Sequence, residues 1–409
     1  MTATKAEPIW KGVKGEERFY VPEFLIRVRQ GNPDVADVPA QDLPITIVRD
    51  IKRVTYKDSL TEIDSFELEV NNWDAEKRKL KYAGTALDGK PGAGPGEMFE
   101  PGRMLELHMG YHGELHLMMV GQVTTLAPSF PAGGVPSLTV HGLNVLHRYK
   151  KQQHTFAWFD KKPSEIAEDI GHRKPSTDAP GIGIEVRTNP KAKEDEEREP
   201  VTFMSGQFDI VFLVELARRR GYSLLLREEK VSGKVKRYLC FEPSQDDRAP
   251  VYRLDWGFSL TSFTPTLRTA RQVSQVTVRG FNRRTGKAIS GSAKWGEKGI
   301  QINRDQQSVA QAVAATEEIV LDRPVRNEAE AKALARDLLL RQLKDMIKGN
   351  GGTVGLPLLR TGRTVEIGGL GTRFSGQYYV TESTHTIGDD GYRTTFTARR
   401  EKPLEEKSA

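Results

Sequence analysis

The sequence predicts an α+β protein dominated by strands, in which two strand-rich domains flank a smaller α+β module. Three observations support this fold class. Short segments that alternate apolar and polar residues follow one another over residues 19–150 and again over residues 256–401. Glycine and proline, 38 and 22 of the 409 residues, gather between these segments, as turn residues do between strands. Apolar residues at helical spacing occur in the middle section, residues 151–255, and again at Glu328–Ile347.

The composition is that of a globular protein with a solvated surface, with 37% hydrophobic and 28% charged residues. No apolar run approaches the roughly 18–20 residues that cross a bilayer, so we expect no membrane insertion. The N-terminal stretch has Lys, Glu and Arg where a signal peptide needs an apolar segment, so we expect synthesis in the cytoplasm without a leader. The net charge is only +6, and no basic stripe carries interleaved aromatic residues. We therefore expect no specific nucleic-acid partner.

Residues 1–18 show no periodicity and are expected to form a tail. Residues 19–150 form the first strand-rich domain, with expected strands in FLIRVR, LPITIVRDIKRVTYK, IDSFELEVNN, RMLELHMGY, ELHLMMVGQVTTL and SLTVHGLN. The side chains expected on one apolar face are Ile45, Ile47, Ile51 and Val54, then Phe66, Leu68 and Val70. Such strands close naturally into a small barrel or sandwich. The loop at 89–102 is too rich in Gly and Pro for regular structure and is expected to leave the barrel.

The middle section, residues 151–255, is predicted to be an α+β module. A short helix begins near Pro163 and ends near Gly171, and the strand-like GIGIEVRT follows. A second helix lies within 206–226, with Gly221 just after its end. Its apolar positions at helical spacing are Phe208, Phe212, Leu213, Leu216 and Ala217. The segments Tyr222–Leu226 and Lys236–Phe241 are predicted to form a hairpin around Ser232 and Gly233. The acidic cluster Glu194–Glu199 is interpreted as a solvated loop.

The second strand-rich domain, residues 256–401, has expected strands in WGFSLTSFTPTL, ARQVSQVTVRGFN, TVEIGG, GQYYVTESTHTI and YRTTFTARR. Asp389, Asp390 and Gly391 supply the turn of its last hairpin. An insertion at about 285–350 interrupts this domain with a polar stretch, 285–326, and a helix from Glu328 to Ile347. Asn327 and Glu330 form a start like a capping box, and Gly349 is expected to end the helix. The expected apolar stripe is Leu334, Leu338, Leu343 and Ile347. Residues 402–409 form a charged tail.

Three histidines four residues apart, His108, His112 and His116, would line one face of a helix and were tested as metal ligands. Glycines within the segment argue against that helix. If a two-residue hairpin turn lies at 112–113, His108 lies opposite Leu117 and His116 lies opposite Met109. The first and last histidines then point to opposite faces of the sheet. With no HExxH or paired CxxC motif present, we predict no metal site.

Other sequence patterns of catalysis are missing, and we predict no catalytic or cofactor-binding residues. The GAGPG stretch at 92–96 neither follows a clear strand nor opens a helix, and no GxxxxGK[ST] or GxSxG motif occurs. The carboxylate pairs Asp246–Asp247 and Asp389–Asp390 lie in predicted turns, where Asp is favoured for backbone reasons. The single cysteine, Cys240, lies in an apolar run and is interpreted as an inert buried thiol.

The order of these segments resembles the phage late control protein D family, the baseplate hub proteins of contractile tails. Related hub chains occur in type VI secretion spikes and extracellular contractile injection systems. The residues that carry the resemblance are Phe212, Leu213, Leu216, Ala217, Gly221 and Tyr222 in the second helix, and Gly376, Tyr378, His385, Gly391 and Tyr392 in the closing strands. The resemblance spans about residues 20–400, nearly the whole chain.

The resemblance implies a homotrimer in which each chain contributes two barrels similar to the tail-tube subunit. Three chains would form a pseudo-sixfold ring that adapts the hexameric inner tube to the trimeric spike. The chain ends soon after the second barrel, so we expect a separate spike protein as partner, together with the inner tube protein and other baseplate components. The resemblance also implies that the protein is incorporated into a phage tail or a contractile injection particle. The residues that contact tube and spike stay unknown at this stage.

Two other functions remain open from the sequence. A cell-wall hydrolase could use carboxylates from distant segments, because glycosidase acids need no local motif. It would require a cleft with two acids about 5–10 Å apart, one of them shielded from water. A nucleic-acid-binding barrel would instead show affinity that falls steeply with salt. We expect a structural protein without enzymatic activity.

Overall fold

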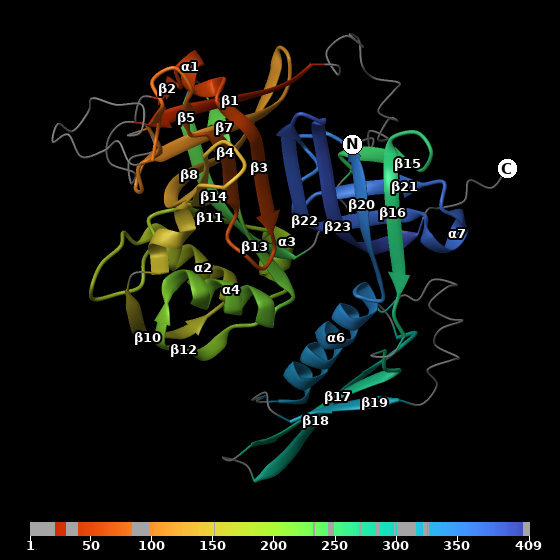
Figure 1. The fold of residues 1–409 in the computed structure, drawn as a ribbon. Helices are drawn as coiled ribbons and strands as arrows, with labels where there is room; N and C mark the ends of the chain where they lie inside the picture. The colour runs from red at the N-terminus through yellow and green to blue at the C-terminus, as the bar shows by residue number, and fades with distance from the viewer. Residues whose placement is uncertain are drawn as a thin grey trace.

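The structure, a computed structural model, describes residues 21–29, 40–83, 98–150, 152–231, 234–243, 249–269, 272–282, 286–297, 300, 316–321, 325 and 327–403. Most of these residues form strands, and the largest sheet has 13 strands. Figure 1 shows its arrangement. Its members are β1 (Pro22–Arg29), β2 (Ala40–Asp42), β3 (Ile51–Ser59), β4 (Ser65–Asn71), β7 (Met104–Tyr111), β8 (Glu114–Ser129), β9 (Ser137–Asn144), β15 (Tyr252–Asp255), β16 (Leu260–Leu267), β20 (Ile347–Val354), β21 (Thr364–Gly368), β22 (Gly376–Gly388) and β23 (Gly391–Pro403).

The two strand-rich parts of the chain are joined edge to edge in this sheet. Its main path runs β16-β20-β23-β22-β3-β4-β9-β8-β7-β1-β2, and β21 pairs with both β15 and β22. The joint is the antiparallel pair of β22 and β3, in which Glu382 lies opposite Ser59 and Ile387 lies opposite Val54. Figure 1 shows β3 and β22 facing each other near the centre of the molecule.

This joint modifies the predicted architecture of two barrel domains. Among the described strands the path is open from β16 to β2, and no closed ring of strands is found. Pairing between β3 and β22 occupies strand edges that closure of separate barrels would have used. Ile387 and Tyr392 of the second part pack into the core of the first, while the second part keeps a separate core around Leu254, Val365 and Tyr378.

The first strand-rich part follows the sequence pattern closely, with one exception. Phe66, Leu68 and Val70 on β4 are buried, as alternation predicts. The segment before β3 is a helical turn, α1 (Ile45–Val48), instead of a strand. Ile45 consequently leaves the predicted apolar face and is 63% exposed. Smaller elements are β5 (Trp73–Asp74), β6 (Lys79–Leu80) and the 3-10 helix η4 (Val145–Lys150). Only residues 98–102 of the loop at 89–102 are described.

The predicted α+β module is present, and its core also includes Met104 and Val120 from β7 and β8. Its elements are β10 (Gln153–Lys161), α2 (Pro163–His172), β11 (Glu185–Thr188), α3 (Pro190–Glu194), β12 (Glu199–Phe208), α4 (Asp209–Arg219), β13 (Tyr222–Val231) and β14 (Lys234–Pro243). The helix α4 buries Phe212, Leu213, Leu216 and Ala217 and is followed by Gly221 at φ 71°, as predicted. Phe208 is an exception, because it ends β12 before the helix begins.

Two further predictions about the module were inaccurate. The acidic cluster is not wholly a solvated loop, because Glu196 is buried and accepts hydrogen bonds from the Ser164 amide (2.9 Å) and hydroxyl (2.6 Å) at the start of α2. Cys240 is half-buried on β14 instead of fully buried. The β13–β14 hairpin itself is confirmed, with Val231 opposite Lys234.

The insertion forms a small unit of its own, in which a helix covers a three-stranded sheet (Figure 1). It comprises β17 (Gln275–Asn282), β18 (Lys287–Lys294), β19 (Glu317–Val320) and α6 (Glu328–Lys344), and the short α7 (Gly371–Phe374) lies later in the chain. The predicted N-terminus of α6 is confirmed, because the Asn327 side chain accepts from the Glu330 amide at 2.7 Å. Much of 285–326 lies outside the described residues.

The face and the end of α6 differ from the prediction. Its buried residues are Ala331, Ala335, Leu339 and Leu343, whereas Leu334 and Leu338 are only partly buried. A Cβ built on Gly291 of β18 would lie 2.3–2.8 Å from Ala331 and Lys332, so the helix backbone rests directly on the sheet. Such a close approach admits alanine and not leucine at the contact. The helix ends at Lys344, and Ile347 and Gly349 belong to β20.

Candidate functional site

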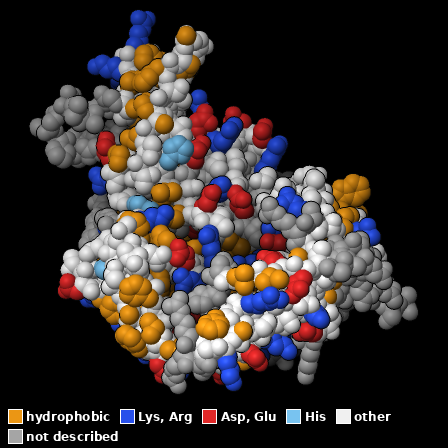
Figure 2. Space-filling model, turned by 90° about the horizontal axis from the view of Figure 1, so that it is seen from below, with side chains coloured by type: hydrophobic (Ala, Val, Ile, Leu, Met, Phe, Trp, Pro, Cys, Tyr) orange, Lys and Arg blue, Asp and Glu red, His pale blue; other side chains and the backbone are white. Residues whose placement is uncertain are grey.

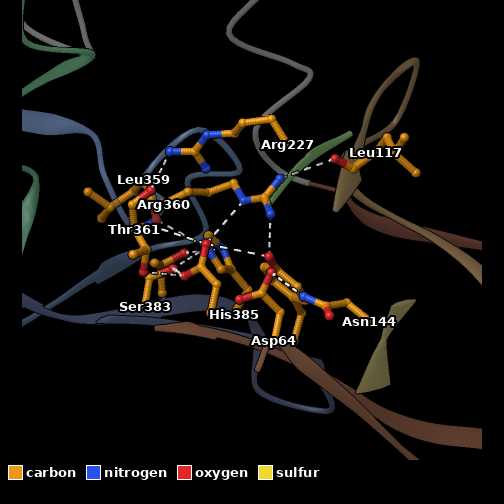
Figure 3. Close-up of polar contacts among 12 residues, drawn as sticks. Asp64, Leu117, Asn144, Arg227, Leu359, Arg360, Thr361, Ser383 and His385 are labelled. Carbon is orange, nitrogen blue, oxygen red and sulfur yellow. Dashed lines mark hydrogen bonds and ion pairs between the residues drawn. The ribbon is translucent and has the colours of Figure 1, made fainter. Parts of the chain in front are cut away.

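The loop at 355–363, between β20 and β21, brings a buried ionic network to the joint of the two strand-rich parts. At its centre is Asp58 of β3, which is 3% exposed. One carboxylate oxygen accepts from Arg360 Nε (3.3 Å) and the Thr361 amide (3.2 Å). The other accepts from Thr361 Oγ1 (2.9 Å) and from the Ser383 hydroxyl. Figure 3 shows Arg360, Thr361, Ser383 and His385 close together in the network.

The electrostatics of the network favour a charged Asp58. Burial alone would raise the pKa of this carboxyl group, but Arg360 and the hydrogen bonds from Ser383 and Thr361 outweigh burial and hold the pKa below its ordinary value. His385 completes the network from β22. Burial lowers its pKa to about 4, so the ring is neutral and can donate from Nε2 to the Leu359 carbonyl (3.1 Å).

The same network ties in the α+β module. Arg360 donates to the Leu117 carbonyl of β8, and Arg227 of β13 donates to the Thr361 carbonyl at 2.7 Å (Figure 3). One loop thus contacts the first strand-rich part, the module and its own sheet. We call the set Asp58, Arg227, Arg360, Thr361, Ser383 and His385 the junction.

A cavity of about 520 Å³ lies beside the junction, between the β3–β4 connection, η4, α4 and β13. Asp64 on its wall accepts from Asn144 Nδ2 at 3.0 Å. Burial, and to a smaller extent the negative charge of Asp58, raise the pKa of Asp64 to about 7. Seen from below, the molecular surface is hollowed between the β10–β12 side and the α6 side, with charged side chains around the hollow (Figure 2).

The histidines tested as metal ligands are separated by the sheet, as their predicted register implies. His108 lies opposite Leu117 and His116 lies opposite Met109. His108 is buried and bonds to Glu106 at 2.7 Å, and Arg29 bonds to the same carboxylate at 2.9 Å. Within the described parts of the chain, no group of three or more His, Cys, Asp or Glu side chains is placed to hold a metal ion.

The outer face of the joined sheet is polar across both strand-rich parts. In one row, residues of neighbouring strands lie side by side: Ser262, Gly352, Thr395, Thr384, Lys57 and Ser65. Charged groups on this face are partly paired, for example Lys57 with Glu382 at 3.0 Å and Glu67 with His141 at 3.4 Å. We call it the polar face. Its composition, rich in Thr and Ser, makes it hydrophilic without a single dominant charge.

The two-stranded ribbon of β10 and β12 has an exposed apolar face. Phe159 lies opposite Val201, and Ala157 lies opposite Phe203. The exposed fractions of Phe159, Val201 and Phe203 are 68%, 48% and 55%. The other face of the ribbon is buried, because Trp158 stacks on Phe212 of α4. Exposed apolar groups of this density mark interaction surfaces. We call this set the ribbon patch.

Comparison with known families gives one match. The family described as "Alg8 N-terminal domain" matches residues 87–389, most of the chain. The chain belongs to this family. A search of curated protein sequences finds no match.

Comparison with solved structures shows which fold this Alg8 N-terminal domain family member has. The 43 kDa tail protein of prophage MuSo2 from Shewanella oneidensis is similar with a TM-score of 0.62 and 14% identity, over 93% of this chain and 98% of that one. A tail protein from Neisseria meningitidis has a TM-score of 0.60 and 11% identity, over 92% and 97%. A chain of the Francisella PdpA–VgrG complex has a TM-score of 0.55 and 10% identity, and the match covers 95% of this chain and 60% of that one. The chain therefore has the fold of phage tail proteins.

The sequence gives no direct sign of the junction, although His385 is among the residues that carry the family resemblance. The predicted carboxylate pair Asp389–Asp390 lies in the turn between Gly388 and Gly391, as expected, whereas Asp246–Asp247 and the GAGPG stretch lie outside the described residues. An available signal was the polar Asp58, Ser383 and His385 at positions where alternation calls for apolar residues. None of the described helices is long and apolar enough to span a membrane.

Proposed function

We propose that this chain is a structural hub protein of a contractile phage tail or a related injection particle, of the late control protein D type. The observation that carries the proposal is the similarity of fold to two phage tail proteins over nearly the full length of both chains. A likeness confined to one domain would be weaker support, because single folds serve many functions. Here the similarity covers more than nine tenths of this chain and of both tail proteins.

In this proposal three chains form a ring with pseudo-sixfold symmetry between a hexameric tube and a trimeric spike. The edge-to-edge sheet supports it, because each chain then presents two strand-rich units side by side in one sheet. The polar face would form the wall of the central channel, where a hydrophilic surface without dominant charge lets cargo pass. The partners would be the inner tube protein on one side, and a separate spike protein and other baseplate components on the other.

The ribbon patch is the surface that we assign to contacts between neighbouring chains. A ring needs heterologous contacts that close on themselves. The patch combines exposed aromatic side chains with a two-stranded sheet whose edges are unpaired in the described residues, and both features favour association.

Light scattering across a concentration series, with negative-stain class averages, tests the proposal. The expected result is a trimer with a threefold ring and pseudo-sixfold density. The double variant Phe159→Asp/Phe203→Asp is expected to be monomeric, whereas Phe130→Asp, an exposed phenylalanine at the β8–β9 tip, is expected to remain trimeric. A monomeric wild type that forms no ring with candidate tube protein would refute the hub.

A hydrolase is the second candidate, because Asp58 and Asp64 line one cavity and have pKa values displaced in opposite directions. We propose that the chain is not an enzyme, since both oxygens of Asp58 are already occupied by protein donors. Release of soluble fragments from purified cell wall tests this. Activity that Asp64→Asn abolishes, at unchanged stability, would establish the hydrolase instead.

A further inference from the structure

The three-stranded sheet of the insertion has one buried face and one exposed apolar face. Val276 and Val278 of β17 are buried and pack against α6. Because side chains alternate along a strand, Phe281 lies on the opposite face, away from α6. Ile319 of β19 lies opposite Thr277 in the parallel pair, so it shares that face, and Leu321 follows β19 directly. The exposed fractions of Phe281, Ile319 and Leu321 are 60%, 45% and 71%. We call these three residues the insertion patch.

The ribbon patch has the same construction as the insertion patch. In both, a helix covers one face of a small sheet, and the other face carries three exposed apolar side chains. With roughly 200 Å² for a whole aromatic side chain, the two phenylalanines of the ribbon patch alone expose about 250 Å². Two sheets of this kind cover each other when they pack face to face, about 10 Å apart. Each patch can thus form the apolar centre of an interface, in which stable complexes bury roughly 800 Å² per partner.

The two patches lie on opposite sides of the chain. Figure 1 shows the ribbon of β10 and β12 at the lower left of the molecule, and β17, β18 and β19 at the lower right. A closed ring of identical chains is held by two different surfaces of each chain, one on either side. A contact of the ribbon patch with itself would give a twofold dimer and leave the insertion patch in water. Trp256 and Phe258 are exposed as well, but they lie in the turn between β15 and β16 and not on a sheet face.

An unpaired charge borders each patch. Arg279 lies two residues before Phe281 on the same face of β17 and is exposed. Asp160 of β10 is next to the ribbon patch and is also exposed. Among the described residues, neither side chain has a hydrogen-bond or ion-pair partner. Lys161, the next charge along the ribbon, lies opposite Glu199. Contact between the patches can therefore supply Arg279 with a carboxylate, and such pairs form strong, bidentate hydrogen bonds.

We propose that the insertion patch of one chain packs on the ribbon patch of the next chain around the ring. The sheet of β17, β18 and β19 then covers the exposed face of β10 and β12, and Arg279 lies at the margin near Asp160 of the neighbouring chain. This inference rests on the proposed hub function, and it names the surface of the neighbouring chain that the ribbon patch binds. The contact is heterologous, so each chain uses its ribbon patch on one side and its insertion patch on the other.

Complementation between two variants of the full-length chain tests the contact. The ribbon variant is Phe159→Asp/Phe203→Asp, and the insertion variant is Phe281→Asp/Leu321→Asp. We expect each variant alone to be monomeric in sedimentation experiments in which the wild type is trimeric. An equimolar mixture keeps one intact contact, so it should form a heterodimer that cannot grow into a trimer. The heterodimer lacks the closure of a ring, so it should require about tenfold higher protein concentration than the wild-type trimer.

The matched control is Trp256→Asp/Phe258→Asp, which places two charges at exposed aromatic positions outside both patches. It should remain trimeric, and circular dichroism should be unchanged in all three variants. A trimer that survives in the insertion variant would overturn this contact while the wild-type trimer upholds the ring. A mixture that stays monomeric across the concentration series would overturn it in the same way. A monomeric wild type that forms no ring with tube protein would instead refute the hub itself, and this contact with it.

Discussion

Replacement of Asp58 by asparagine removes one negative charge from the junction while keeping the shape of the side chain. The carboxylate accepts five hydrogen bonds, from Arg360, Thr361, Ser383 and Tyr56. The asparagine side chain has only one acceptor oxygen. Its NH₂ group takes the place of the second carboxylate oxygen and therefore faces the donors that this oxygen accepted from. Loss of one partner of a buried ion pair leaves the other charge uncompensated and costs about 3–5 kcal/mol. We expect the free energy of unfolding of Asp58→Asn to fall by that amount.

Urea unfolding at neutral pH, followed by circular dichroism, measures this difference. The control is Asp42→Asn, which breaks the ion pair with Arg27 at 2.6 Å, where the Asp42 side chain is 61% exposed. An exposed pair contributes about 0–1 kcal/mol, so the control should remain close to the wild type. Limited proteolysis should also show earlier cleavage in the loop at 355–363 for the Asp58 variant. A loss no larger than that of the control would refute the reasoning.

The stability of the wild type and of Asp58→Asn should also depend differently on pH. The folded-state pKa of Asp58 lies below its unfolded value, so its contribution to stability is present above about pH 4 and is lost as the pH falls through the folded pKa. Wild type and Asp58→Asn should therefore converge in stability in acid and diverge towards neutral pH. A difference that is constant across this range would contradict a charge-based role.

Three further predictions concern other sites. Asp64 has a folded-state pKa of about 7, above its unfolded value of about 4, so its ionisation costs stability as the pH rises from 4 to 7. A shift of about three pKa units corresponds to about 4 kcal/mol, so Asp64→Asn should be more stable than the wild type by about that amount at pH 8 and by far less at pH 4.5. Equal differences in urea unfolding at both pH values would exclude this. A Cβ on Gly355 would lie 1.9 Å from the Tyr392 ring, so Gly355→Ala should cost about 2–3 kcal/mol in thermal unfolding, whereas Gly133→Ala, which meets nothing within 4 Å, should cost little. Asn327→Ala should remove the cap of α6 and cost about 1 kcal/mol, and Asn327→Asp should restore it; equal melting curves for the two variants would contradict the capping role.

The elements that sequence reasoning predicted correctly are those whose signal is contained in a short segment. The helix α4 combines apolar spacing with Gly221 after its end, and the β22–β23 hairpin has Asp389, Asp390 and Gly391 at its turn. The register of the β7–β8 hairpin followed from the two-residue turn alone. These features need only neighbouring residues, because turn chemistry and periodicity act within one or two elements.

The predictions that failed concern segments whose structure depends on the residues that pack against them in the folded chain. The face of α6 was assigned to leucines, but the close approach of Gly291 on β18 selects the small Ala331 at the contact. The four-residue helix α1 was taken for a strand, because alternate isoleucines fit both structures over so short a segment.

The sequence by itself determined the class of the fold, the order of its strand-rich parts and module, and most helices and hairpins. Tertiary structure alone decided the pairing of β3 with β22, the open path of the sheet, and the junction with its cavity. Asp58 and Arg360 are 302 residues apart, and no local period relates them. Long-range strand pairing depends on which strand edges and buried charges find partners in the folded chain. The sequence of either segment alone does not contain that information.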